Sequence, residues 1–159
     1  MVHYHDSGCA VATCGNLFIC VFRDPSTLER LTHIRRAIER HAAHFGADTI
    51  SISVLEPSAA SSVPKEVRDE TAALTRDFQS IAAAIVIEGA GFRAATLRTI
   101  LAGIYLLAKS PYPHKILDSV QNATRWLREQ AEHSPNRLTI TEMVNAVEQA
   151  RHAISAKVA

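Results

Sequence analysis

Two glycines two residues apart give the chain its most suggestive chemical motif. Residues 88–94 read Glu-Gly-Ala-Gly-Phe-Arg-Ala, which places G-x-G-x-x-A between an apolar run and a helical pattern. In dinucleotide-binding proteins this spacing brings backbone N–H groups to a pyrophosphate. Asp118, the candidate ribose contact, lies further from the glycines than is usual in dinucleotide-binding proteins. Only one short strand follows the motif, so the second half of such a sheet is missing. We therefore expect a turn and, as an alternative function, a pocket for an anionic phosphate or carboxylate group, formed by Gly89, Gly91, Arg93 and Arg98.

Five potential metal ligands lie near the N-terminus: His3, His5, Cys9, Cys14 and Cys20. Gly15-Asn16 separates two apolar runs and predicts a two-residue hairpin turn with positive φ first. The resulting register pairs Cys14 with Leu17, Val11 with Cys20 and Cys9 with Phe22. Because side chains alternate between faces, Cys9 and Cys20 share one face and Cys14 lies on the other. One metal cannot collect all three thiolates, so we predict small core cysteines, no metal and no cofactor.

A basic stripe lies on one side of a helix that is predicted to end near Gly46, and it comprises His33, Arg36, Arg40 and His44. Apolar residues at helical spacing fill the other side, so the stripe faces solvent. Its histidines gain charge below about pH 6.5. We hypothesise that this face docks an acidic partner. His41 is expected to share the solvated face, and no third ligand is visible to complete a metal site with His41 and His44.

Composition limits the class of protein. The chain has 159 residues, and 17 Lys and Arg against 16 Asp and Glu leave a net charge of +1. This balance argues against a nucleic-acid binder that works by bulk charge. Three cysteines are too few for a disulfide scaffold, and the N-terminus does not resemble a secretory signal, so we expect a cytoplasmic protein. The longest apolar stretch, 94–108, contains Arg98 and is too short to span a bilayer.

Hydrophobic periodicity predicts the element order β-β-α-β-α-β-α-β-α-α. The expected strands are 9–14, 17–22, 49–55, 83–87 and 115–117, the last a short edge strand. A capping box of Ser26 and Glu29 opens the first helix, and a second box, Thr139 and Glu142, opens the last. Helix 92–108 is apolar almost all round, which predicts a central position.

Strands that alternate with helices predict one α/β domain over residues 1–159. We expect a mixed, mostly parallel five-stranded sheet with an N-terminal hairpin and about five flanking helices. The order of elements, the Gly-Phe-Arg after the fourth strand and the segment Ile-Leu-Asp-Ser-Val at 116–120 are similar to the STAS-like fold of anti-sigma-factor antagonists. The resemblance covers about residues 8–132 and leaves the helix at about 139–156 as an addition.

The STAS-like resemblance implies a regulatory serine near the start of the second helix, where phosphorylation by a partner kinase blocks binding. The corresponding residues here are Ser58, Ser61 and Ser62, although the loop is longer and lacks the family's Asp-Ser-Ser-Gly motif. We therefore expect a non-enzymatic, protein-binding regulatory module in a bacterial cytoplasm. Its partner would be another protein, and the Ala-rich last two helices allow a homodimer.

Overall fold

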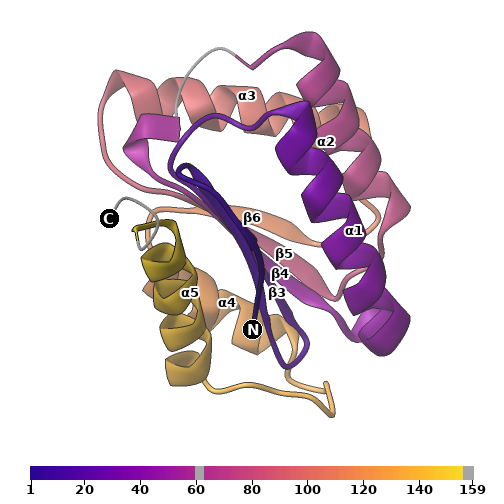
Figure 1. The fold of residues 1–159 in the computed structure, drawn as a ribbon. Coiled ribbons are helices and arrows are strands. Elements are labelled where there is room, and N and C mark those ends of the chain that lie inside the picture. Colours follow the sequence, from indigo (N-terminus) through magenta and orange to yellow (C-terminus); the bar gives the residue numbers. More distant parts are fainter. Residues whose placement is uncertain (60–62, 156–159) are drawn as a thin grey trace.

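Six strands form one sheet with helices on both faces (Figure 1). The computed structural model describes residues 1–59 and 63–155. The strands are β1 (Val2–His5), β2 (Cys9–Cys14), β3 (Leu17–Phe22), β4 (Ile50–Leu55), β5 (Ala82–Ile87) and β6 (His114–Leu117). The helices are α1 (Leu28–Phe45), α2 (Lys65–Asp77), α3 (Phe92–Ala108), α4 (Val120–Gln130) and α5 (Ile140–Ser155). Two short 3-10 helices are η1 (Gly46–Asp48) and η2 (Pro57–Ala59). The α/β class is confirmed.

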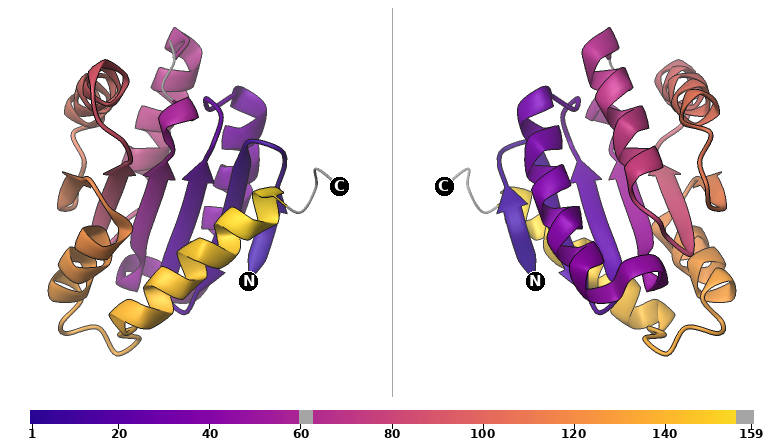
Figure 2. Two further views of the ribbon diagram at one scale, coloured as in Figure 1. Left: turned by 90° about the vertical axis from the view of Figure 1, so that its left-hand side faces the viewer. Right: turned by 90° about the vertical axis from the view of Figure 1, so that its right-hand side faces the viewer.

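The strands lie in the order of the sequence, from β1 at one edge to β6 at the other. β1, β2 and β3 pair antiparallel, whereas β3, β4, β5 and β6 pair parallel. Parallel connections are right-handed, and each one here moves to the next strand in the same direction. For this reason the connecting helices α1, α2 and α3 lie on one face of the sheet. Helices α4 and α5, which follow the last strand, cover the other face (Figure 2).

The predicted hairpin is confirmed in every pair. Gly15 has a φ of +50°, and the register matches Cys14 with Leu17, Val11 with Cys20 and Cys9 with Phe22. Cys9 and Cys20 contact the hydrophobic cluster beneath α1, and Cys14 contacts the cluster on the opposite face. All three are free thiols.

The sheet has six strands rather than five, because residues 2–5 form an edge strand that hydrophobic periodicity did not reveal. Val-His-Tyr-His is exposed or half-buried throughout. Polar contacts, rather than apolar ones, hold this strand at the edge of the sheet. The Asp6 carboxylate accepts hydrogen bonds of 2.7 Å from the backbone N–H groups of Gly8 and Cys9. The guanidinium of Arg30, on α1, lies 2.9 Å from the same carboxylate.

Helix α1 starts one residue later than its predicted capping box. Thr27, not Ser26, is the N-cap, and its hydroxyl accepts a hydrogen bond of 3.2 Å from the N–H of Arg30. The Arg30 side chain also donates to the carbonyl of Pro25 at 2.7 Å, which fixes the turn before the helix. The other end of α1 is at Gly46, as predicted, and its φ of +55° favours glycine.

Helix α5 is held at both ends. Its predicted capping box is confirmed, because the N–H of Thr139 donates to Glu142 at 2.8 Å and the N–H of Glu142 donates back to the Thr139 hydroxyl at 3.2 Å. Near the other end, the guanidinium of Arg151 donates to Glu88 at 2.9 Å and lies 3.3 Å from Glu56. Glu56 and Glu88 follow β4 and β5, so this ion network fastens α5 to the carboxyl ends of the central strands.

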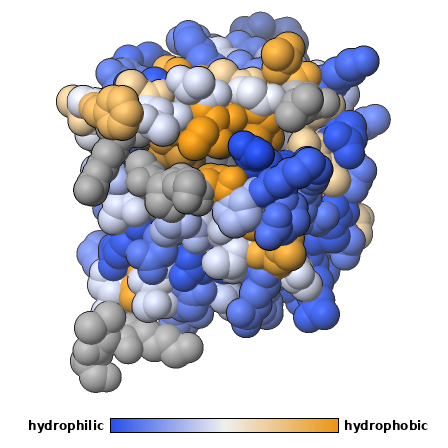
Figure 3. All heavy atoms as spheres, turned by 90° about the horizontal axis from the view of Figure 1, so that it is seen from above, coloured by the Kyte–Doolittle hydropathy of each residue, from blue (hydrophilic) through white to orange (hydrophobic). Residues whose placement is uncertain are grey.

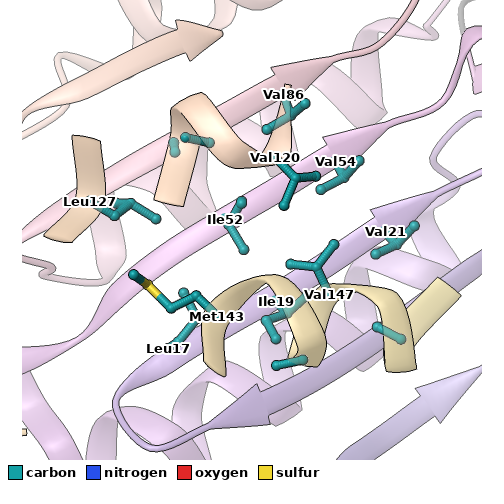
Figure 4. Packing of buried hydrophobic residues seen from close by; sticks show 14 of the residues in the cluster. Leu17, Ile19, Val21, Ile52, Val54, Val86, Val120, Leu127, Met143 and Val147 are labelled. Carbon is teal, nitrogen blue, oxygen red and sulfur yellow. The ribbon is translucent and has the colours of Figure 1, made fainter. Parts of the chain in front are cut away.

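The main hydrophobic cluster lies between the sheet and the α4–α5 layer. Figure 4 shows Leu127 of α4 and Met143 and Val147 of α5 directed toward Ile19 and Ile52 of the sheet. All five side chains are almost completely buried. The alanines of α4 and α5 that suggested a homodimer are also packed inside this cluster, namely Ala123, Ala146 and Ala150.

Helix α3 has the predicted bounds, but the prediction that it is central is wrong. Phe92 and Leu106, near its two ends, are 86% and 80% exposed. The strands stand upright in Figure 2 and α3 is seen nearly end-on, so this helix rises steeply from the sheet. It rests on α2 by packing Ile104 and Ala108 against Ala72. No described helix is both long enough and apolar enough to cross a membrane.

The contrast between α3 and α4 can be tested with two leucines. Leu127→Ala removes a completely buried side chain of the main cluster and should lower the free energy of unfolding by about 2–5 kcal/mol. Leu106→Ala, the matched control on α3, should change it by less than about 0.5 kcal/mol. Urea denaturation measures both values. Equal losses would show that α3 is buried after all.

Candidate functional site

A largely apolar cavity lies between the sheet and the layer formed by α1, α2 and α3. Its volume is about 170 Å³. We call it the inter-layer cavity. Its floor comes from β3, β4 and β5, and its walls come from the three helices and the loops that follow β3 and β4. Figure 3 looks onto the carboxyl ends of the strands and shows apolar side chains gathered at the surface in the middle of this side.

The cavity exists because the floor of the sheet is made of small residues at its centre. Strand β4 alternates Ile50, Ile52 and Val54 toward the main cluster with Ser51 and Ser53 toward the cavity. The neighbouring strands add Cys20 from β3 and Ala83 from β5 to the same floor. Side chains this short do not fill the space below the helices. The steep rise of α3 leaves the space above them open.

Hydroxyl groups supply most of the polar atoms in the described lining of this cavity. Ser51, Ser53, Tyr105 and Tyr112 line it, and within residues 1–59 and 63–155 their hydroxyls make no hydrogen bond. Two lining threonines differ, because Thr71 and Thr75 donate to helix carbonyls at 2.7 and 3.0 Å. The first four hydroxyls can bond a ligand or water.

The tyrosines of the cavity are neutral. Burial raises the pKa of Tyr112 to about 12. Burial also raises the pKa of Tyr105, with smaller contributions from Tyr112 and Cys20, and its ring stacks on His114 at 4.3 Å. Both phenols therefore keep their protons near neutral pH and can donate as well as accept hydrogen bonds.

Charge is scarce around the cavity. Among the described lining residues, Asp24 is the one carboxylate, and there is no Lys, Arg or His. Arg30 approaches Asp24 at 3.7 Å, but it also forms a closer ion pair with Asp6. Burial raises the pKa of the Cys20 thiol well above its ordinary value, and the nearby Cys9 adds to the shift, so this thiol is a poor nucleophile. The described lining therefore offers one carboxylate and an unreactive thiol.

The predicted glycine turn is present at the start of α3. Gly89 and Gly91 both have a φ of +87°, and a Cβ on Gly89 would lie 3.0 Å from Cγ of Pro57. These backbone conformations favour glycine, which agrees with the prediction that the segment is a turn. Arg98 is half-buried, whereas the side chain of Arg93 lies outside what the structure describes. The anion pocket stays a prediction.

Of the three serines, Ser58 is described, and Ser61 and Ser62 lie outside the described residues. Ser58 is exposed in η2, and its hydroxyl donates to the backbone carbonyl of Arg23 at 2.5 Å. Arg23 begins the loop after β3, in which Asp24 and Ser26 line the cavity. The Ser26 hydroxyl is buried and has no hydrogen-bond partner in the described part of the chain. Ser58 therefore touches a segment that also borders the cavity.

The basic stripe of α1 is only partly solvated. Arg36, Arg40 and His44 are exposed. His33 stacks on Tyr4 at 4.1 Å between ring centroids, a contact that depends on the unforeseen strand β1. The prediction that His41 faces solvent is wrong: the residue is 6% exposed, and its ring lies among aromatic rings and the Asn16 carbonyl.

No cluster of three or more metal-ligating side chains occurs in the described part of the chain. Comparison with protein-family models and with curated proteins found no match. Function must therefore be argued from the cavity and the surface around it. A partial signal for this cavity lies in the sequence, because Ser51, Ser53, Cys20 and Ala83 are small residues on three neighbouring strands, but alternation does not show that helices cover them.

His41 should make stability depend on pH. Burial lowers the pKa of His41 below 6.5, with help from His3 and His44 and against the hydrogen bond to Asn16. Below pH 6.5 the unfolded chain takes up a proton that the folded chain does not. The free energy of unfolding should therefore fall as the pH falls, by at most about 1.4 kcal/mol per pH unit.

Urea denaturation between pH 7.5 and pH 5 measures this slope. His41→Gln should flatten it, and His152→Gln, which changes an exposed ring on α5, should leave it as it is. An unchanged slope in the His41 variant would contradict the assignment.

Proposed function

We propose that this protein is a non-enzymatic binding module that holds a small, predominantly apolar molecule in the inter-layer cavity. The observation that carries the proposal is the combination of an apolar cavity of about 170 Å³ with hydroxyl groups that have no partner within the described residues. A well-formed apolar pocket with a few convergent polar groups is the usual form of a small-molecule site. An engineered cavity of about 150 Å³ is enough to bind benzene.

The cost of the cavity supports a role in binding. Protein interiors are close-packed, and space that side chains leave unfilled costs packing contacts. Larger side chains in place of Ser53 or Ala83 would remove most of this cost. Residues that break a packing rule without a structural gain are typical of functional sites.

A cavity-filling variant tests the proposal. Ala83→Leu should raise the melting temperature and abolish the binding of toluene and of an anilinonaphthalene dye, because the added side chain occupies the floor of the cavity. Ala90→Leu, which adds the same side chain at an exposed loop position, is the matched control and should bind both probes normally. Calorimetry and dye fluorescence give the affinities. Equal binding by both variants would place the probes elsewhere.

We also propose that the protein has a regulatory role, and this proposal rests on the STAS-like resemblance. A hairpin (β2 and β3) followed by strand–helix units is the order of elements that this resemblance implies. A protein partner is the second candidate function, and the contact between Ser58 and Arg23 favours it. Phosphorylation of Ser58 would break that hydrogen bond and add negative charge next to the backbone of Arg23.

Partner binding is tested with variants of the described serine. Ser58→Asp should reduce the amount of protein partner recovered with the purified chain from its native cell, because the charge disturbs the loop after β3. Ser58→Ala removes the same hydrogen bond without adding charge, so it should recover much more partner than the Asp variant. If both variants recover as much partner as the unmodified chain, Ser58 has no regulatory role.

A further inference from the structure

The side of α3 that faces away from the sheet forms an uncharged stripe. Leu97, Ile104 and Ala108 fill the inner side, where they pack on the sheet and on α2. Phe92 and Leu106 stand on the outer side and are 86% and 80% exposed. The exposed residues at helical spacing, which we call the outer face of α3, are Phe92, Ala95, Thr96, Thr99, Ala102 and Leu106. Exposed apolar side chains that gather in one patch usually mark an interaction site.

A row of cations borders the outer face on the side of β6. Tyr105 stacks on His114, the first residue of β6, so this flank of the helix faces the edge of the sheet. Arg98 lies seven residues before Tyr105 and therefore on the same flank. Lys109 follows the helix directly and is exposed, as are His114 and Lys115. Figure 2 shows α3 as the outermost helix of its layer on this side, so the outer face and these cations meet solvent together.

This region of the sequence has no acidic residue. Residues 89–117 contain no Asp or Glu, and their cations are Arg93, Arg98, Lys109 and Lys115. Because the whole chain carries a net charge of only +1, the other residues together are negative. Glu88, directly before the segment, is paired with Arg151, and Asp118, directly after it, offsets at most one of the four cations. Positive charge is therefore concentrated on α3 and β6, which complements an anionic surface.

The combination of apolar and cationic groups fits lipid. A nucleic acid or an acidic peptide would pair with the cations but offers little apolar surface to Phe92 and Leu106. A second copy of the chain would bring the same cations together. The boundary between headgroups and acyl chains offers anionic and apolar groups side by side. We infer that the outer face of α3 docks the protein on an anionic lipid bilayer, with Arg98 and Lys109 at the headgroups.

The helix lies along the membrane plane. Phe92 and Leu106 are about 21 Å apart along the helix axis, so both reach the headgroup–acyl boundary only when α3 is parallel to it. This orientation agrees with the finding that no described helix can cross a membrane. The inference concerns the outside of α3 and does not depend on the inter-layer cavity.

Vesicle sedimentation tests the docking. The full chain should bind phosphatidylcholine vesicles that contain about 30% phosphatidylserine at least about tenfold more tightly than vesicles of phosphatidylcholine alone. Raising the salt to about 0.5 M should remove most of this difference, because the charges are then screened. Equal binding to both kinds of vesicle, or no binding, would overturn the inference.

Charge variants locate the contact. Arg98→Gln combined with Lys109→Gln should weaken binding to the anionic vesicles by roughly thirtyfold, since each cation near the surface contributes about tenfold or slightly less. Arg36→Gln combined with Arg40→Gln, the matched control, removes two exposed cations from α1 and should weaken binding by less than about twofold. Equal losses would show that net charge alone attracts the protein and that α3 is not the docking face.

Apolar variants test the insertion at constant charge. Phe92→Ser combined with Leu106→Ser should weaken binding to the anionic vesicles by at least about tenfold. Val2→Ser combined with Leu28→Ser changes two exposed apolar side chains outside α3 and should leave the affinity as it is. Circular dichroism and melting temperature establish that each variant is folded.

The remaining occupants give different results. If duplex DNA or polyglutamate binds as tightly as the anionic vesicles and the Phe92 and Leu106 variant binds all of them normally, the surface acts by charge alone and the lipid assignment is wrong. If light scattering shows a dimer that this variant dissociates, and vesicles do not bind, a second copy covers the outer face. Each of these failures leaves the proposed function of the cavity as it stands.

Discussion

The constraint on which the rest of the structure depends is the direction of the strand connections. Strands β3 to β6 follow one another across the sheet, so right-handed connections place α1, α2 and α3 on the same face. Helices α1 and α2 lie along this face, whereas α3, at the end of the series, rises from the sheet and packs on α2 (Figure 2).

The opposite face carries only α4 and α5, and both lie close to the strands. This side holds the main cluster with its completely buried Leu127, Met143 and Ile154. The ion network of Arg151 with Glu56 and Glu88 joins α5 to the carboxyl ends of β4 and β5, and the side chains of Arg151 and Glu56 are only 17% and 16% exposed. A well-packed face of this kind supplies stability for the sheet as a whole. The other face can therefore retain a cavity without loss of the fold.

Local signals in the sequence predict the elements well, and contacts between distant segments explain the failures. Gly15-Asn16 fixes the register of the hairpin, and Thr139 with Glu142 fixes the start of α5, because both act within a few residues. Strand β1 was missed because its place depends on the contact of Asp6 with Arg30, which is distant in sequence. The exposure of α3 and the burial of His41 also depend on how elements pack, which apolar periodicity does not report.

The cavity could not be deduced for the same reason. Alternation along β4 shows that Ser51 and Ser53 share a face, but it does not show whether a helix covers them. That depends on the tilt of α3, which no residue in β4 sets. A strand with isoleucine on one face and serine on the other is usually an exposed strand. Here it is central, and its serine face borders a covered space.

The loop after β3 connects the cavity with the surface feature that the sequence singled out. Ser58 holds the carbonyl of Arg23, and Asp24 and Ser26 of the same loop line the cavity. A ligand that changes the position of this loop would change the surroundings of Ser58. By linkage, a modification of Ser58 that favours one position of the loop would then change the affinity for the ligand. The bound ligand would in turn change the equilibrium for the modification by the same factor. The contact of Ser58 and part of the cavity lining therefore lie on one segment.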